Sequence, residues 1–163
     1  MKLENVLVVV SETDASHRAV EYIGRILGNS SNVDIHLVFF GTNLPPELLE
    51  FGGSETPETE ERLDNELHER QRRWIAVADE GPEAVLDGAR DLLRRSGVEA
   101  SRISTCVSSP LDHRTDADEI LLLAQDEQCD TVVVGQGPSD ERGRKLAQSL
   151  MRRADGHAIW IVN

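Results

Sequence analysis

The sequence lacks long apolar segments and has few basic residues. No apolar run approaches the length that crosses a bilayer, and the N-terminus MKLENVLVVV has neither the basic region nor the cleavage site of a signal peptide. Lys and Arg number 17 against 30 Asp and Glu, a formal net charge of −13. Nucleic acids and anionic membranes bind basic surfaces. We therefore expect a cytoplasmic protein with no nucleic-acid and no membrane partner.

Cysteine and histidine are also scarce. Cys106 and Cys129 are isolated in the sequence and adjoin predicted strands, which favours two buried free thiols over a disulfide or a metal site. No two of the five histidines have the i, i+4 spacing of metal ligands on a helix. No nucleophile with a partner base is recognisable. These patterns predict no metal ion and no catalytic residue.

The chain alternates between short apolar runs and helical patterns. Residues 5–10 (NVLVVV) form a continuous apolar run, which is typical of a strand buried on both faces. Apolar residues then recur at helical spacing over 19–27, and Gly28-Asn29 provides a stop. Further strands are predicted over 35–40, 103–107, 131–134 and 158–162, with helices over 62–95, around 120–124 and between the last two strands.

This alternation predicts an α/β fold. Five strands separated by helices indicate a five-stranded parallel sheet covered by helices on both faces, in a single domain over residues 1–163. Residues 42–61, rich in proline and acidic residues, are expected to form a long irregular loop or a lid. Gly81-Pro82 is expected to divide the helical region over 62–95.

The candidate site lies where the predicted strands end. In a parallel α/β sheet, ligands bind beyond the carboxyl ends of the strands, at the point where the strand order reverses. Ser11 follows the first strand, Phe40 ends the second, and Gly135-Gln136-Gly137 follows the fourth. Glycines let the backbone approach a phosphate, and the amides at a helix start donate to it.

Other residues of the same loop oppose a phosphate. Pro138 has no amide hydrogen, and the carboxylates of Asp140 and Glu141 would repel an anion, although Arg142, Arg144 and Lys145 could add positive charge. The glycine spacing is one residue too long for a P-loop. A simple strand-to-helix turn is the alternative to a phosphate cradle. Near the first strand, Asp14 is expected to cap the helix that follows.

Two long segments carry a family resemblance. NVLVVVSETDASHRAVEYI resembles the opening strand, acidic-serine loop and first helix of the universal stress protein (UspA-like) family, and residues 118–162 resemble its closing half. The resemblance covers nearly the whole chain. It implies a Rossmann-like sheet of strand order 3-2-1-4-5 and a homodimer made through the last strand.

The resemblance is weakest at the nucleotide site. In ATP-binding members the glycine loop reads G-x2-G-x9-G-[ST]; aligned from Gly135, its second glycine falls on Pro138, its third on Gln148 and its hydroxyl on Ser149. The aspartate that those members carry after the first strand is replaced by Ser11. The resemblance therefore implies a branch that does not hold ATP in the usual way, and no cofactor is expected.

The last predicted strand favours self-association. Residues 158–162 (AIWIV) are apolar on both faces although this strand should lie at a sheet edge, and such an edge pairs readily with another chain. We expect Ile159, Trp160 and Ile161 at a homodimer interface. The alternative is a lone edge whose faces are covered by helices.

The function expected from these observations is binding without turnover. The resemblance implies a domain that acts in the stress response through an unknown protein partner. The alternative is an ATP- or AMP-binding switch, or a slow ATPase, that uses the loop at Gly135–Pro138 together with Ser11, Phe40, Gln148 and Ser149.

Overall fold

The computed structural model describes residues 5–40, 62, 65, 66, 68, 81–108, 116–138 and 140–163. Its centre is a sheet of five parallel strands in the order β3-β2-β1-β4-β5. The strands are β1 (Asn5–Val10), β2 (Asp34–Phe39), β3 (Ile103–Val107), β4 (Thr131–Gly135) and β5 (Ala158–Val162). The sequence prediction of the fold class and of the strand order is confirmed.

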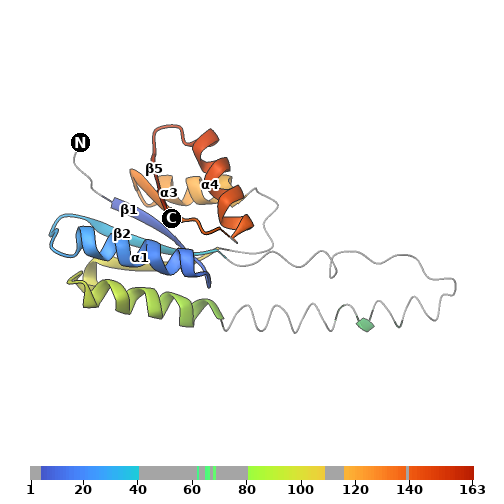
Figure 1. The fold of residues 1–163 in the computed structure, drawn as a ribbon, viewed down its shortest axis with the longest axis horizontal. Helices are drawn as coiled ribbons and strands as arrows, with labels where there is room; N and C mark the ends of the chain where they lie inside the picture. Colours follow the sequence, from blue (N-terminus) through green and yellow to red (C-terminus); the bar gives the residue numbers. More distant parts are fainter. Residues whose placement is uncertain are drawn as a thin grey trace.

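Helices cover both faces of this sheet (Figure 1). α1 (Asp14–Leu27) and the helix over residues 81–95 pack on one face, and α3 (Asp116–Asp126) and α4 (Glu141–Arg153) pack on the other. A short 3-10 turn, η2 (Ala100–Arg102), precedes β3. This division follows from the parallel strand order, because each right-handed crossover places its helix on the face that its direction dictates.

The alternation of side chains along β1 builds one core on each face. Val6, Val8 and Val10 belong to the core under α1, and Leu7 and Val9 belong to the core under α3 and α4. All five are at most 6% exposed. A strand buried on both faces has no polar positions, which explains its continuous apolar run.

The predicted strand boundaries agree with the structure to within one residue, whereas α1 begins at Asp14, before the helical pattern over 19–27. The helix expected around residues 120–124 is longer and spans Asp116–Asp126. The predicted loop over residues 42–61 and most of the helical region before Gly81 lie outside the described residues. Gly81 and Pro82 are helical, and the helix continues without a break to Arg95. A break in the helical region would therefore have to lie before Gly81.

One cysteine prediction is wrong. Cys129 is buried, but Cys106 is exposed on β3. The core under α3 and α4 contains residues of β1, β2, β4 and β5 but none of β3, so the Cys106 side of this edge strand is left uncovered by that core. Burial, with the charges of Glu127 and Asp130, raises the pKa of the Cys129 thiol to about 12.

Candidate functional site

The loop between β1 and α1 is held by its own hydroxyl groups. The Ser11 amide donates to Ser16 Oγ at 2.8 Å, and the Thr13 amide donates to Ser11 Oγ at 3.4 Å. The Ser16 amide donates to Thr13 Oγ1 at 3.2 Å, and Ser16 is only 3% exposed. Three of the amides that this loop could offer to an anion, those of Ser11, Thr13 and Ser16, are therefore used within the loop.

The helix cap in this loop differs from the sequence prediction. Thr13, in an extended conformation, is the N-cap of α1, and Asp14 is the first helical residue. The shorter Thr side chain reaches the Ser16 amide from one residue earlier, as N-cap hydroxyls do. The Asp14 carboxylate consequently lies at the exposed start of α1 and is not the cap.

Gly135, at the end of β4, packs directly against the start of α1. A methyl group on Gly135 would overlap the Ala15 carbonyl and lie 2.8 Å from the Ser16 amide nitrogen. Only glycine allows this strand and helix to approach so closely. The glycine that suggested a phosphate cradle thus has a packing role.

The residues that follow Gly135 use their polar groups internally. The Gln136 amide donates to the Val162 carbonyl of β5 at 2.7 Å. The Gly137 carbonyl accepts from the Asp140 amide at 3.2 Å, and Asp140 Oδ1 caps α4 by accepting from the Gly143 amide at 2.8 Å. A carboxylate therefore occupies the start of α4, where a phosphate would otherwise find helix amides.

The structure does not bring all the predicted nucleotide residues together. Gln148 and Ser149 lie inside α4, which begins at Glu141. At the 1.5 Å rise per helical residue, they are roughly 10 Å along the helix from its start. Pro138 is exposed in the loop itself, and Gln148 is exposed on α4.

Phe40 lies on the α4 side of the sheet and already has a partner. Its side chain is 6% exposed, and the Arg142 guanidinium lies 5.4 Å from the ring centroid. Arg142 also lies 3.8 Å from an Asp116 carboxylate oxygen. This cation–π contact occupies the ring face that a stacked base would use.

Two of the basic side chains expected near the loop, Lys145 and Arg142, already contact other residues. Lys145 Nζ lies 2.9 Å from Glu141 Oε1, and this hydrogen bond is the main cause of the lowered pKa of the Glu141 carboxyl. Arg142 is held by Phe40 and Asp116. Arg18 of α1 is the additional basic side chain near the loop, at 3.6 Å from a methyl group placed on Gly137.

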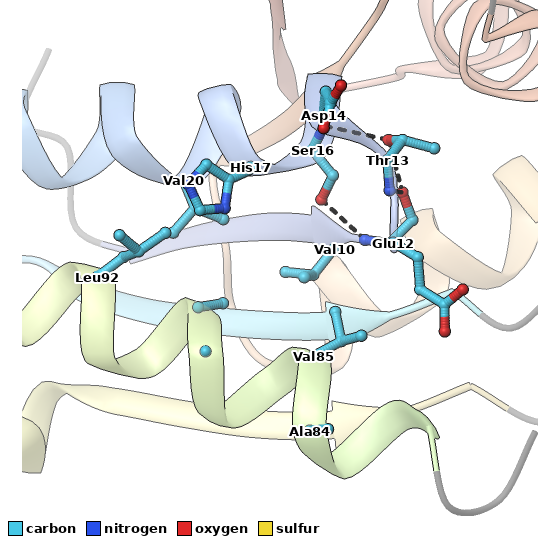
Figure 2. Close-up of a pocket in the computed structure, with 13 residues that line it drawn as sticks. Val10, Glu12, Thr13, Asp14, Ser16, His17, Val20, Ala84, Val85 and Leu92 are labelled. Carbon is cyan, nitrogen blue, oxygen red and sulfur yellow. Dashed lines mark hydrogen bonds between the residues drawn. The ribbon is translucent and has the colours of Figure 1, made fainter.

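A pocket of about 380 Å³ opens on the other side of the β1–α1 loop, between α1 and the helix over residues 81–95 (Figure 2). Val85 and Leu92 project from that helix towards Val10 and Val20 (Figure 2). Its polar lining comes from the β1–α1 loop and the start of α1: Ser11, Glu12, Thr13, Asp14, Ser16 and His17. Ser11 alone of the eight predicted nucleotide residues lines this pocket.

The sequence does not predict this pocket, because the pattern over 62–95 indicates a helix and no cavity beside it. Ala84 and Gly88, which line the pocket, are small and exposed. A glycine inside a helical pattern was the available signal, since it weakens a helix without an evident reason.

One serine and histidine pair lies away from both loops. Ser104 Oγ is 2.5 Å from His36 Nδ1, and Glu127 Oε2 is 3.5 Å from the same nitrogen. A relay needs the nucleophile and the acid on opposite nitrogens of the ring. The two contacts on one nitrogen therefore describe a local polar cluster and not a triad.

The described residues contain no group of three or more His, Cys, Asp or Glu side chains placed to hold a metal ion. Among the helices described, none has both the length and the apolar character to cross a bilayer.

β5 forms one edge of the sheet, as predicted. Ile159 and Ile161 pack against the core under α4, and Trp160 packs against the core under α1. The Ala158 amide donates to the Asp130 carbonyl and the Val162 carbonyl accepts from Gln136, so this set of alternate residues faces β4. The amides of Ile159 and Ile161 therefore point away from β4, towards the open edge.

Comparison with known proteins identifies the family. The sequence model described as "Universal stress protein family" matches residues 2–155. A solved universal stress protein in complex with cAMP has 21% identity and a TM-score of 0.59, over 100% of this chain and 98% of its own. A universal stress protein from Archaeoglobus fulgidus in complex with dAMP has 14% identity and a TM-score of 0.57, over 99% of this chain and 98% of its own.

A third solved structure, from the same family in Burkholderia pseudomallei, has 15% identity and a TM-score of 0.59 over 98% of this chain and 96% of its own. No curated protein shows significant sequence similarity to the chain. At these identities the likeness to solved structures establishes the fold.

Proposed function

The chain belongs to the universal stress protein family, and we propose that it acts in the cytoplasm by binding a protein partner, without the ATP binding usual in that family. The proposal rests on the loop between β4 and α4. Its glycine is used for packing against α1, its Gln136 amide for the sheet, and its helix start for an aspartate cap. These contacts leave fewer amides of the loop for an ATP phosphate.

The charge around the two loops supports the same proposal. Glu12, Asp14 and Glu141 are exposed carboxylates beside the two helix starts, and Asp140 caps the second. Carboxylates at a helix N-terminus stabilise the helix but repel an anion that would bind there. The free energy of binding a triphosphate is therefore reduced at the positions where the fold would offer amides.

The alternative function is an adenine-nucleotide switch or a slow ATPase. Two similar structures contain cAMP and dAMP, both with a single phosphate and an adenine base. A monophosphate needs fewer donors than ATP, and Arg18 near Gly137 could meet one phosphate. The switch predicts saturable binding of AMP, cAMP or ATP, and the slow ATPase predicts that ATP binds and is hydrolysed.

Copurified nucleotide distinguishes the two functions. The purified full-length chain is denatured and the supernatant is chromatographed; we expect well under one equivalent of any nucleotide. Thermal unfolding is then followed with ATP, AMP and cAMP, and we expect no shift. A ligand present at a hundredfold over its Kd would add about 2.7 kcal/mol. Near-stoichiometric nucleotide, or saturable stabilisation by one of the three, contradicts the proposal.

A restoring variant tests the role of the altered family positions. Pro138→Gly, Gln148→Gly and Ser11→Asp together return the family residues to this chain. Because Gln148 lies well inside α4 and Gly135 remains packed against α1, we expect little gain in ATP affinity. A gain of tenfold or more in ATP affinity by calorimetry would show that the three substituted residues, and not the packing of the loop, prevent ATP binding.

We also propose that the protein is a homodimer through β5. Its outward amides and its half-buried apolar residues leave an edge that a second copy can complete. Ile159→Pro removes an outward amide without touching the hydrogen bonds to β4. Light scattering is expected to show a monomer for this variant and a dimer for the native chain. A dimer for both would place the interface elsewhere.

A further inference from the structure

We propose that the pocket between α1 and the helix over residues 81–95 is a binding site for a small organic cation, an amine carried on an apolar body. The pocket is separate from the glycine loop, and the proposal holds whether or not a nucleotide binds there. Three features carry it: space that the fold does not require, an apolar wall, and a mouth that offers acceptors.

The space is maintained by a glycine that the fold does not require. A methyl group on Gly88 would meet no atom within 4 Å, and its φ is not in the left-handed region. At Gly24, Gly28 and Gly135, in contrast, an added methyl group would meet backbone or side-chain atoms closer than 3.0 Å. Glycine inside a helix costs about 0.5–1 kcal/mol relative to alanine. At Gly88 no close packing requires a glycine, so its cost in helix stability is not explained by the fold. What the missing side chain leaves is open space in the pocket.

The pocket has the size and the apolar wall of a small-molecule site. Its volume of about 380 Å³ falls within the range of roughly 300–1,000 Å³ typical of ligand pockets. Val10, Val20 and Ala89 belong to the core, and Val85 and Leu92 pack against it, so the wall is fixed by the fold (Figure 2). Such a wall suits an aromatic or branched aliphatic body.

The mouth favours a donor with positive charge. None of the described residues that line the pocket is Lys or Arg. The amides of Ser11, Thr13 and Ser16 are used within the loop. The carboxylates of Glu12 and Asp14 are exposed and make no ion pair with any described residue. An ammonium group would donate charge-assisted hydrogen bonds to these two carboxylates, whereas the carboxylates would repel a phosphate or a carboxylate ligand.

Both acidic residues line the pocket. Glu12 Oε1 lies 3.3 Å from where a methyl group on Gly81 would be, so it lies beside the helix over residues 81–95. Asp14 begins α1. His17 is turned to Glu21, with 3.7 Å between Nε2 and Oε1, so the nearest ionisable base already has an acidic neighbour.

Three probes of one shape test the charge preference. Amide chemical shifts of the full-length chain are followed by NMR during titration with 2-phenylethylamine, 2-phenylethanol and 3-phenylpropanoate at neutral pH. We expect saturable shifts at Gly88, Ser11 and Asp14, with the amine binding at least about threefold tighter than the alcohol and the carboxylate weakest. No saturable shift with the amine, or equal affinity for the three probes, overturns the proposal.

Variants then separate the pocket from its charge. Gly88→Leu fills open space, so we expect at least a tenfold loss of amine affinity with no fall in Tm; Gln125→Leu, at an exposed position of α3, is the control that leaves the affinity unchanged. Glu12→Gln with Asp14→Asn should reduce the amine to the affinity of the alcohol. Unchanged amine binding in Gly88→Leu, or an amine preference that survives the double substitution, contradicts the site. Nucleotide binding at the glycine loop would instead shift the amide signals of Gly137 and Asp140. The amine site and the nucleotide site can therefore be confirmed or rejected independently.

Discussion

The end of β4 and the helix over residues 81–95 both lie beside the β1–α1 loop and the start of α1, yet they differ in what surrounds their glycines. On the β4–α4 side, Gly135 is pressed against the start of α1 and no room remains for a side chain. On the far side of the β1–α1 loop, Gly88 faces an open pocket. A glycine can therefore mark either close packing or free space, and only the atoms around it distinguish the two cases.

The largest effect is expected from Gly135→Ala. The added methyl group meets backbone atoms of α1, which cannot move without shifting the helix, so we expect a loss of about 3 kcal/mol in the free energy of unfolding. Urea denaturation measures it. Gly137→Ala is the matched control, because its methyl group would meet Ala15 Cβ at an ordinary 3.4 Å. Equal stability of the two variants would mean that Gly135 is not a packing glycine.

An intermediate effect is expected from Asp140. Asp140→Ala removes the cap on the Gly143 amide and should cost about 1 kcal/mol, whereas Asp140→Asn keeps an accepting oxygen and should cost much less. Thermal unfolding of the two variants separates the hydrogen bond from the charge. If the asparagine variant is as unstable as the alanine variant, the carboxylate charge and not the cap stabilises this end of α4.

The smallest effect, of opposite sign, is expected from Gly88→Ala. A methyl group here meets nothing and improves helix propensity, so the free energy of unfolding should rise by about 0.5–1 kcal/mol. Chemical denaturation beside Gly135→Ala gives the direct comparison. A loss of stability would mean that the pocket closes around Gly88 in solution, and the contrast between the two glycines would disappear.

Much of the fold could be predicted from the sequence because the pattern of burial repeats along it. Residues 6–10 (VLVVV) are apolar at every position since β1 is the central strand, and residues 132–134 (VVV) show the same pattern in its neighbour β4. The predicted burial of Cys106 is wrong because a strand pattern does not show whether the strand lies at the edge of the sheet. At that edge, no residue of β3 joins the core under α3 and α4. The helix cap was placed one residue late, because SETDAS contains several residues able to cap.

The candidate site was predictable only in part. Ser11, Phe40 and Gly135–Pro138 were found by their position after strands, which topology makes general. That Phe40 stacks with Arg142, and that Ser149 lies well inside α4, depends on where the helices begin. The pocket beside Gly88 brings together segments more than 60 residues apart, and Gly88 inside a helical pattern is a local signal that does not show which segment lies opposite it.

The sequence alone determined the alternation of strands and helices, the family to which the chain belongs and the positions that depart from that family's nucleotide motif. These are local or pairwise patterns, and periodicity records them directly. The arrangement in space determined what the glycines do, since the approach of Ala15 to Gly135 and the open space beside Gly88 arise from how α1 packs on its neighbours. The space around a residue depends on the atoms that pack near it in the folded chain, and the residue's identity does not specify those atoms.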